Sequence, residues 1–464
     1  MKYTPRSVGE MSKPMPAPAG RRPPAARRGL RSVARKAAAY APLLFLFWFM
    51  FYQNLPEDLN GMAFKPFSTL GAVDRLIKIG TIVLALSVLI GRLAVSRQML
   101  KNINPGLVAI MVLIPLGTIW SIDSSATILR YVTLLGIVLL CLAIPVAGWD
   151  RQRLQEIVLP PVMFILVASL AIGVVSPQSV KEVGTDISLN NAWHGITFQK
   201  NQFGTTASIV TILCVHKVLA PGKHTFWTFV GIGTALLCLV LSRSSTSLLS
   251  MLLVVMYMVM VLKVPVVKRR FTTLVTVGVF STILVYELAV QNLIPGVQTL
   301  LAPVMHLTGK DMTFSARSII WDVIKQHSAG APWLGTGYGA YWTGPNPGSP
   351  SYIFIGLMYF YPTESHNGYL EILNDLGRVG LICLLLFLIS HVRQALQLMK
   401  FDRGQAVLYL ALLFQQMVDN LSESEWFSRT ATCTILLLGS ACLSRALSEK
   451  RASAEPVVAR TGGR

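Results

Sequence analysis

The chain has 464 residues, of which 53% are hydrophobic and only 13% are charged. A soluble domain carries roughly 25% charged residues, so this composition excludes an ordinary soluble protein and indicates a polytopic membrane protein. The formal net charge is +20. We expect no nucleic-acid partner, because the basic stretches lack interleaved aromatic residues and a recognisable binding fold.

The first 36 residues are rich in proline, alanine and arginine, and their only acidic residue is Glu10. Such a stretch is too poor in apolar side chains to form a core, so we predict a disordered cytoplasmic tail held near anionic membrane lipids. A membrane domain is expected over 37–446. A second cytoplasmic tail is expected over 447–464.

Apolar segments follow one another along the membrane domain, and each approaches the roughly 20 residues that cross a bilayer. Twelve can be distinguished, at residues 38–54, 76–95, 105–120, 129–148, 156–176, 203–220, 225–242, 245–263, 271–290, 368–390, 404–420 and 427–446. We therefore predict an all-α protein with about twelve transmembrane helices. The first segment is interpreted as an uncleaved span, because the residues after it lack a small-residue cleavage pattern.

The six cysteines all fall inside these apolar segments. Their spacing is typical of buried small side chains and gives no sign of a disulfide pair or a metal site. We expect no cofactor and no bound metal.

Basic residues in the short loops alternate in a way that sets the orientation. They lie in every second turn, at Arg97, Lys101, Arg151, Arg153, Lys217, Lys223, Lys263, Lys268, Arg269, Arg270, Arg393, Lys400 and Arg403. The positive-inside rule then places both termini in the cytoplasm of a bacterial inner membrane. The opposite loops would be periplasmic.

Two long loops fall on the predicted periplasmic side, at about 176–201 and 291–364. A loop as long as the second is uncommon unless it is functional. Within it, Ile319, Ile320, Val323 and Ile324 have helical spacing. This pattern predicts a short amphipathic helix that could lie on the membrane surface.

Two arginines on this side are candidate anion ligands. Arg243 lies in the turn Ser242-Arg243-Ser244 between two apolar segments, and arginine beside hydroxyl groups at a helix start suits an anion. The Arg243 side chain could equally extend to the lipid headgroups. Arg317 precedes Trp321 by one helical turn, and this pair could be a ligand site or a solvated charge with an interfacial tryptophan.

Two further polar stretches lie on the same side. Lys200 and Asn201 are at the start of an apolar segment, where lysine could bind phosphate or simply mark the helix end. His366 begins a stretch that continues with Tyr369 and Glu371. If this stretch is helical, His366 and Tyr369 share one face. A lone histidine at a helix start is more often structural, but its acidic neighbours favour a functional role.

These residue types together indicate a particular chemistry. Arginine binds diphosphate bidentately and keeps its charge when partly desolvated. A histidine can remove a proton from a sugar hydroxyl. No cluster of metal-binding carboxylates is apparent. Glu57 and Asp58 lie in the first outer loop, where they could form an ordinary solvated turn or take part in a metal-assisted reaction.

Five motifs in this order resemble the O-antigen ligase/polymerase superfamily, over about residues 105–446. They are Lys200-Asn201-x-Phe203-Gly204, Ser242-Arg243-Ser244, Arg317-x-x-x-Trp321, Leu334-Gly335-x-Gly337-x-Gly339 and His366-Asn367-x-Tyr369-Leu370-Glu371. The glycine run and the histidine motif are most similar to exopolysaccharide polymerases of the succinoglycan type.

The resemblance implies a GT-C-like glycosyltransferase fold with short helices in the late periplasmic loop. It implies metal-independent transfer of a glycan from a polyprenyl diphosphate carrier to an acceptor glycan. Arg243 and Arg317 would bind the carrier diphosphate, and His366 would activate or position the acceptor. The substrate-binding residues would be Lys200, Asn201, Arg243, Arg317, Tyr369 and Glu371. A chain-length regulator and export machinery are further partners of such an enzyme.

Two other functions are kept as alternatives. A ligase would carry out the same transfer onto a lipid A core. A transporter or flippase of lipid-linked sugars would instead carry charged residues near the middle of its spans.

Overall fold

The computed structural model describes residues 40–46, 72–148, 154–182, 191–220, 225–290, 315–358 and 361–461. The basic N-terminal tail, most of the first apolar segment and the pair Glu57 and Asp58 lie outside these residues. The regular structure of the described part is helical, apart from an isolated β-bridge between Lys181 and Trp193.

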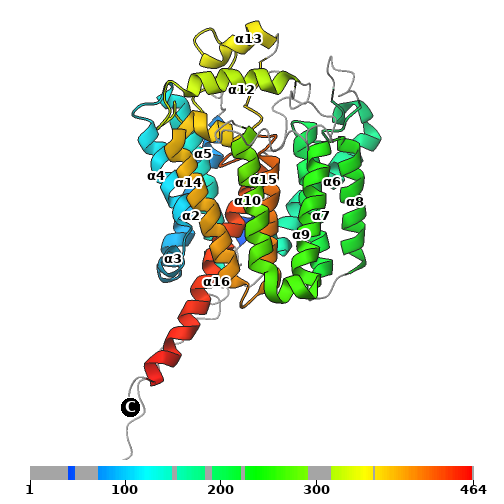
Figure 1. Cartoon of the computed structure of the whole chain (residues 1–464), viewed down its shortest axis with the longest axis vertical. Helices are drawn as coiled ribbons and strands as arrows, with labels where there is room; N and C mark the ends of the chain where they lie inside the picture. Colours follow the sequence, from blue (N-terminus) through cyan, green and yellow to red (C-terminus); the bar gives the residue numbers. More distant parts are fainter. Residues whose placement is uncertain are drawn as a thin grey trace, which may run out of the picture.

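A bundle of roughly parallel and antiparallel helices forms the body of the protein (Figure 1). Its helices are α2 (Ala72–Gly91), α3 (Leu93–Leu100), α4 (Pro105–Gly117), α5 (Ser124–Ala147), α6 (Leu154–Val175), α7 (Lys200–Leu219), α8 (Phe226–Ser242), α9 (Ser245–Lys263), α10 (Thr272–Val290), α14 (Gly368–Leu398), α15 (Arg403–Asp419) and α16 (Ala431–Thr461). The predicted segment 76–95 covers most of α2 and the start of α3, and every later predicted apolar segment overlaps one of these helices.

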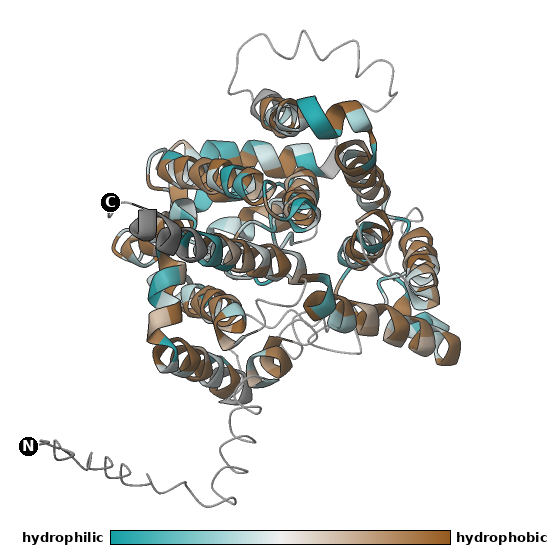
Figure 2. Ribbon diagram, turned by 90° about the horizontal axis from the view of Figure 1, so that it is seen from below, coloured by the Kyte–Doolittle hydropathy of each residue, from teal (hydrophilic) through white to brown (hydrophobic). Residues whose placement is uncertain are grey.

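Among the described residues, six helices are long and apolar enough to cross a membrane, and a bent pair would make seven. This supports a polytopic membrane protein. The expected number of about twelve spans stays a prediction, because α4 and α8 are apolar but shorter. Exposed apolar side chains, such as Trp227 and Val240 on α8, fit a lipid environment. Hydrophobic residues predominate along the helices of the bundle (Figure 2).

The segment predicted as one span at 76–95 is bent. The helix axis turns by 95° between Gly91 and Leu93, so α2 and α3 are separate helices. Arg92 lies at the bend, and its Nη1 donates a hydrogen bond to the carbonyl oxygen of Val146, 2.9 Å away. Hydropathy alone could not reveal this bend, because the apolar pattern continues across it.

Helix α15 lies in the middle of the bundle, in contact with α7, α9, α14 and α16 (Figure 1). Almost all of its residues are buried, including polar ones. The Gln415 side chain donates hydrogen bonds to Ser250 Oγ and to the Asp419 carboxylate, at 2.8 to 3.0 Å. Pairing of this kind allows polar side chains to be buried in the bundle.

Helix α14 is broken at Gly377, where φ is 65° and ψ is −162°. An inserted loop segment supplies the lost helical hydrogen bonds. The backbone N–H groups of Arg378 and Val379 donate to the carbonyls of Pro332 and Trp333, at 3.0 and 3.1 Å. In return, the carbonyls of Asn374 and Asp375 accept from the N–H groups of Thr336 and Gly337. The glycine run Gly335 to Gly339 is therefore a structural clamp on α14. At Gly335 a Cβ atom would overlap the Asp375 carbonyl, so this close approach to the helix backbone requires glycine.

The late loop contains α12 (Ser315–Ser328) and α13 (Ile353–Met358), as expected. Helix α12 lies across one end of the bundle, which we call the loop face (Figure 1). Its apolar face was predicted to lie on the membrane surface. Instead, Ile320, Trp321 and Ile324 are buried with Leu370 of α14 and the aromatic loop residue Trp342. The apolar face is used to dock α12 on the bundle.

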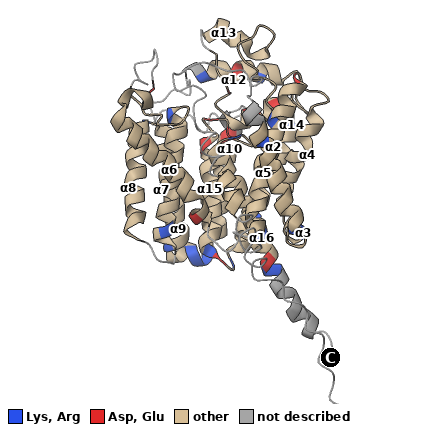
Figure 3. Cartoon of the chain, turned by 180° about the vertical axis from the view of Figure 1, so that it is seen from behind, with Lys and Arg blue, Asp and Glu red and all other residues tan. Residues whose placement is uncertain are grey.

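Charged residues are distributed unevenly between the two ends of the bundle. Figure 3 shows Lys and Arg positions along the ribbon around the end of α9 that is opposite the loop face, whereas Asp and Glu positions gather beneath α12. Helix α16 begins at Ala431, later than the predicted 427, and continues beyond residue 446 through most of the predicted C-terminal tail. The orientation in the membrane stays a prediction.

Candidate functional site

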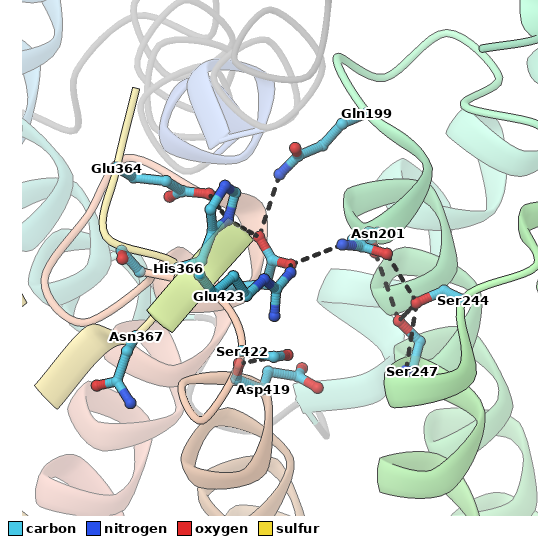
Figure 4. Close-up of polar contacts among 12 residues, drawn as sticks. Gln199, Asn201, Ser244, Ser247, Glu364, His366, Asn367, Asp419, Ser422 and Glu423 are labelled. Atoms are coloured by element: carbon cyan, nitrogen blue, oxygen red, sulfur yellow. Dashed lines mark hydrogen bonds and ion pairs between the residues drawn. The ribbon is translucent and has the colours of Figure 1, made fainter. Parts of the chain in front are cut away.

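A cluster of polar side chains lies at the loop face, beneath α12 (Figure 4). Its centre is Glu423, in the short turn between α15 and α16. Two amides donate to this carboxylate: Asn201 Nδ2 at 2.7 Å and Gln199 Nε2 at 3.3 Å. Two cationic groups also contact it: Arg317 Nη2 at 3.4 Å and His366 Nδ1 at 3.5 Å. We call these five residues, together with Glu364, the Glu423 cluster.

The turn that carries Glu423 is held by Asn420. Its side-chain oxygen accepts hydrogen bonds from the N–H groups of Glu425 and Trp426, both at 2.9 Å. Its carbonyl accepts from the N–H of Gly368 at the start of α14, also at 2.9 Å. The turn is thus fastened to the segment that carries His366, and Glu423 is directed toward that residue.

His366 precedes α14 and does not belong to it. Its φ is 53°, in the left-handed region, and α14 starts two residues later with Asn367 as its N-cap. The prediction that His366 shares a helical face with Tyr369 is therefore wrong. Asparagine is a preferred N-cap because its side-chain oxygen accepts orphan backbone N–H groups, here those of Tyr369 and Leu370. Helix α14 must then begin after His366.

Arg317 is brought to the cluster by α12. The Trp321 indole N–H, one turn along the helix, donates to the carbonyl of Ser365 at 2.9 Å. This bond and the buried apolar face fix α12 against the segment before α14. The Arg317 guanidinium consequently reaches the Glu423 carboxylate, from which it is separated by 106 positions in the chain.

Arg243 lies at the end of α8 and is connected to the cluster through its neighbour. It is exposed, and it adopts a left-handed conformation with φ 51°. Ser244 Oγ donates to Asn201 Oδ1 at 3.1 Å, and the amide of Asn201 donates to Glu423. The structure therefore joins the Arg243 turn, Asn201, Arg317 and His366 into one region.

The other predicted site residues have different partners. Lys200 begins α7, and its backbone N–H donates to Glu182 Oε1 at 2.7 Å. The Tyr369 hydroxyl donates to the carbonyl of Met417 inside the bundle. Glu371 accepts from the Trp342 indole and from a backbone N–H, so it anchors the aromatic loop. Substrate binding by these three residues stays a prediction.

Sequence reasoning missed the residue at the centre, Glu423. It lies in Ser422-Glu423-Ser424-Glu425, a short acidic stretch between two apolar segments on the loop face. Two glutamates in so short a turn are the signal that could have found it, because carboxylates beside hydrocarbon are costly.

The charges of the cluster influence one another. Burial favours the neutral imidazole, but hydrogen bonds and ion pairing with Glu364 and Glu423 outweigh it and raise the pKa of His366 to about 10. Burial also raises the pKa of Glu423 above its ordinary value, although contacts with His366 and Arg317 lower it. Burial also acts to raise the pKa of Glu364, but contacts with His366 outweigh burial and lower this pKa below its ordinary value. His366 is therefore a cation at neutral pH.

We expect this charge to appear in a pH titration of stability. The folded-state pKa of about 10 exceeds the ordinary value of 6.5, so the contribution is complete below about pH 6.5 and is lost as the pH rises through about 10. The thermal unfolding midpoint of the wild type should exceed that of His366→Gln most at pH 6. A difference that stayed constant from pH 6 to 10.5 would show that His366 is not held as a cation.

Glu364, His366 and Glu423 could also hold a metal ion, since their ligand atoms lie within 4.8 Å of one another. Binding of an ion there would have to displace the Arg317 guanidinium from the Glu423 carboxylate and the proton from His366, because a metal ligand must be a neutral imidazole.

The fold and the cluster define a multi-pass helical membrane protein with a candidate anion site at one end of its bundle. Residues 230–385, about a third of the chain, match the family model described as O-antigen ligase. This match supports the resemblance to the O-antigen ligase/polymerase superfamily. It includes Arg243, Arg317 and His366, whereas Asn201 and Glu423 fall outside it. No curated protein matches the chain.

Proposed function

We propose that the protein is a polysaccharide polymerase of the bacterial inner membrane, which transfers glycan units from a polyprenyl diphosphate carrier to a growing exopolysaccharide. The observation that carries this proposal is the convergence of Arg317 and protonated His366 at the loop face, within the region joined to the Arg243 turn. Positive groups beside amide donors suit a diphosphate. The family match supports the same kind of transfer.

The backbone conformation gives further support. Among the described residues, the non-glycine residues with positive φ are Asn191, Arg243, His366 and Phe427. Strained conformations of this kind persist where the surrounding structure holds them, and they are concentrated at functional sites. Two of these four residues are the proposed ligands Arg243 and His366.

In the proposed reaction, an acceptor hydroxyl attacks the anomeric carbon of the donor glycan. A new glycosidic bond forms, the bond from that carbon to the diphosphate oxygen breaks, and its electron pair leaves with polyprenyl diphosphate. Arg243 and Arg317 stabilise the charge on this leaving group. The hydroxyl proton passes to a cluster carboxylate, Glu364 or Glu423, and then exchanges with water. His366 is already protonated, so it donates a hydrogen bond that positions the reactants, and no metal takes part.

The test is to analyse the glycans that accumulate when the gene is deleted. A polymerase predicts single repeat units on the carrier, and these should be converted to polymer when the wild-type gene is restored. Restoring the gene with Arg243→Ala, Arg317→Ala or His366→Ala, at normal protein levels, should leave the single units. Wild-type polymer from all three variants would contradict the assignment.

The ligase alternative predicts a different product, namely full-length polymer that remains on its carrier after deletion. A transporter predicts charged residues midway along its spans. Among the described residues, the buried carboxylates of the bundle helices lie toward the loop face: Glu287 is in the last turn of α10, Asp375 is eight residues into α14, and Asp419 is the last residue of α15. This position favours chemistry at the membrane surface. Purified protein that moved donor across a vesicle bilayer without consuming it would favour the transporter.

A further inference from the structure

Four amide or cationic groups, from three segments of the chain, surround the single carboxylate of Glu423. Figure 4 shows Gln199, Asn201 and His366 beside it. Gln199 and Asn201 come from the start of α7, Arg317 from α12 and His366 from the segment before α14. Two of these donors are amides and two are cations. A set of converging amide N–H, guanidinium and imidazolium groups is what an anion such as phosphate requires.

The side chains that carry the two cations are partly exposed at the loop face, although His366 Nδ1 itself is buried, and the Glu423 carboxylate is more buried than either side chain. The side chains of Arg317 and His366 are each 23% exposed, and that of Glu423 is 7% exposed. An anionic ligand arriving from outside would therefore meet the two cations first. It would compete with Glu423 for the same donor groups.

A partly desolvated pair of cations needs a counter-charge when no ligand is bound. Burying uncompensated charges is costly, so the two cations need carboxylate partners when the site is empty. Glu364 contacts His366 Nδ1 at 3.2 Å. The Asn420-held turn supplies the carboxylate that the two cations share, by directing Glu423 between Arg317 and His366.

We propose that Glu423 is an internal counter-anion, which occupies the diphosphate position in the empty enzyme and is displaced when the lipid-linked donor binds. The inference rests on the proposed function, since it assumes a diphosphate ligand. A diphosphate carries more charge and more acceptor oxygens than one carboxylate, so it can take over these donors. Competition with Glu423 reduces the affinity of the site for the diphosphate. After the reaction, the return of Glu423 helps to release the polyprenyl diphosphate product, and product release limits turnover in many enzymes.

The experiment measures binding of farnesyl diphosphate, a short prenyl diphosphate, to the full-length protein in lipid nanodiscs. Glu423→Gln keeps the shape and one acceptor oxygen but removes the charge. We expect this variant to bind farnesyl diphosphate at least about tenfold more tightly than the wild type, equivalent to roughly 1.4 kcal/mol, and to release it more slowly. A side chain with a purely structural role would not increase affinity when it is replaced.

Two controls isolate the effect. Farnesol has the same lipid chain without the diphosphate, and its binding should not differ between the two proteins. Glu425→Gln removes a carboxylate from the same turn that is equally buried, at 6% exposed for both residues. It should leave the affinity for farnesyl diphosphate within about twofold of the wild type, because Glu425 does not contact the donor groups that would bind the ligand.

The outcomes distinguish the two proposals. Wild-type binding that depends on Arg317, together with unchanged or weaker binding by Glu423→Gln, would overturn the counter-anion and leave the proposed function intact. Absence of diphosphate-dependent binding in both proteins would overturn both. If Glu423→Gln does not fold, Glu423→Asp tests the same point. Its shorter side chain should loosen the contacts with Arg317 and His366 and tighten ligand binding by a smaller factor, and equal or weaker binding would overturn the proposal.

Discussion

Replacing Arg317 with alanine is expected to slow glycan transfer by at least about 100-fold, the usual effect of removing one donor that stabilises a developing anion. Arg317 is one of two cations at Glu423, and its loss leaves only Arg243 and His366 to meet the charge of the leaving diphosphate. The fold should survive, because α12 is docked by Ile320, Trp321 and Ile324, which the substitution does not change.

The measurement is the transfer rate of purified protein with a lipid-linked donor. Arg317→Lys should recover only part of the activity, since lysine keeps the charge but lacks the planar fork of guanidinium. Arg378→Ala provides a matched control. Arg378 is an exposed arginine of α14 whose guanidinium lies 5.2 Å from the centre of the Trp333 ring, and its loss should leave the rate nearly unchanged. Near-wild-type transfer by Arg317→Ala would remove this residue from the mechanism.

Replacing Gly377 with alanine is expected to destabilise the protein by about 3 kcal/mol or more. The φ of 65° with a ψ of −162° is a conformation that is essentially restricted to glycine. A Cβ atom at this position would also overlap the Trp333 carbonyl and the Leu334 nitrogen. The loop segment would have to separate from α14, which would leave the backbone groups at the break without partners in the bundle interior.

We would measure the amount of folded protein in membranes and its thermal unfolding midpoint in detergent. Gly278→Ala is the matched control, because Gly278 lies inside α10 and a Cβ there meets no atom within 4 Å. Alanine favours helix over glycine, so the control should be neutral or slightly stabilising. Equal stability of the two variants would show that the break in α14 does not need glycine.

Much of the helical framework could be predicted, because an apolar run long enough to cross a membrane is a local property of the chain. The segments at 203–220, 245–263 and 404–420 coincide with α7, α9 and α15 to within a few residues. The bend at Arg92 and the break at Gly377 could not be predicted in this way, since both are stabilised by hydrogen bonds to distant segments. The burial of the α12 apolar face also depends on distant residues that pack against it, such as Leu370 of α14 and Trp342 of the late loop.

The candidate site was predictable only in part. His366 and Asn201 stood out as polar groups beside apolar segments, and Arg317 stood out in the loop helix before Trp321. The structure places all three around one carboxylate. That carboxylate, Glu423, was missed because its importance depends on neighbours far away in the chain. The protonation state of His366 could not be predicted from the sequence either, because contacts of its ring with two carboxylates raise its pKa.

The sequence by itself determined the class of protein, the approximate positions of the helices and the polar residues beside them. Hydropathy and charge act locally and along the chain, so these features can be read residue by residue. Only the tertiary structure decided that the glycine run clamps a broken helix, that α12 covers the loop face and that Glu423 lies between Arg317 and His366. Each of these results depends on hydrogen bonds or charges between residues that are distant in sequence, and folding alone brings them within reach.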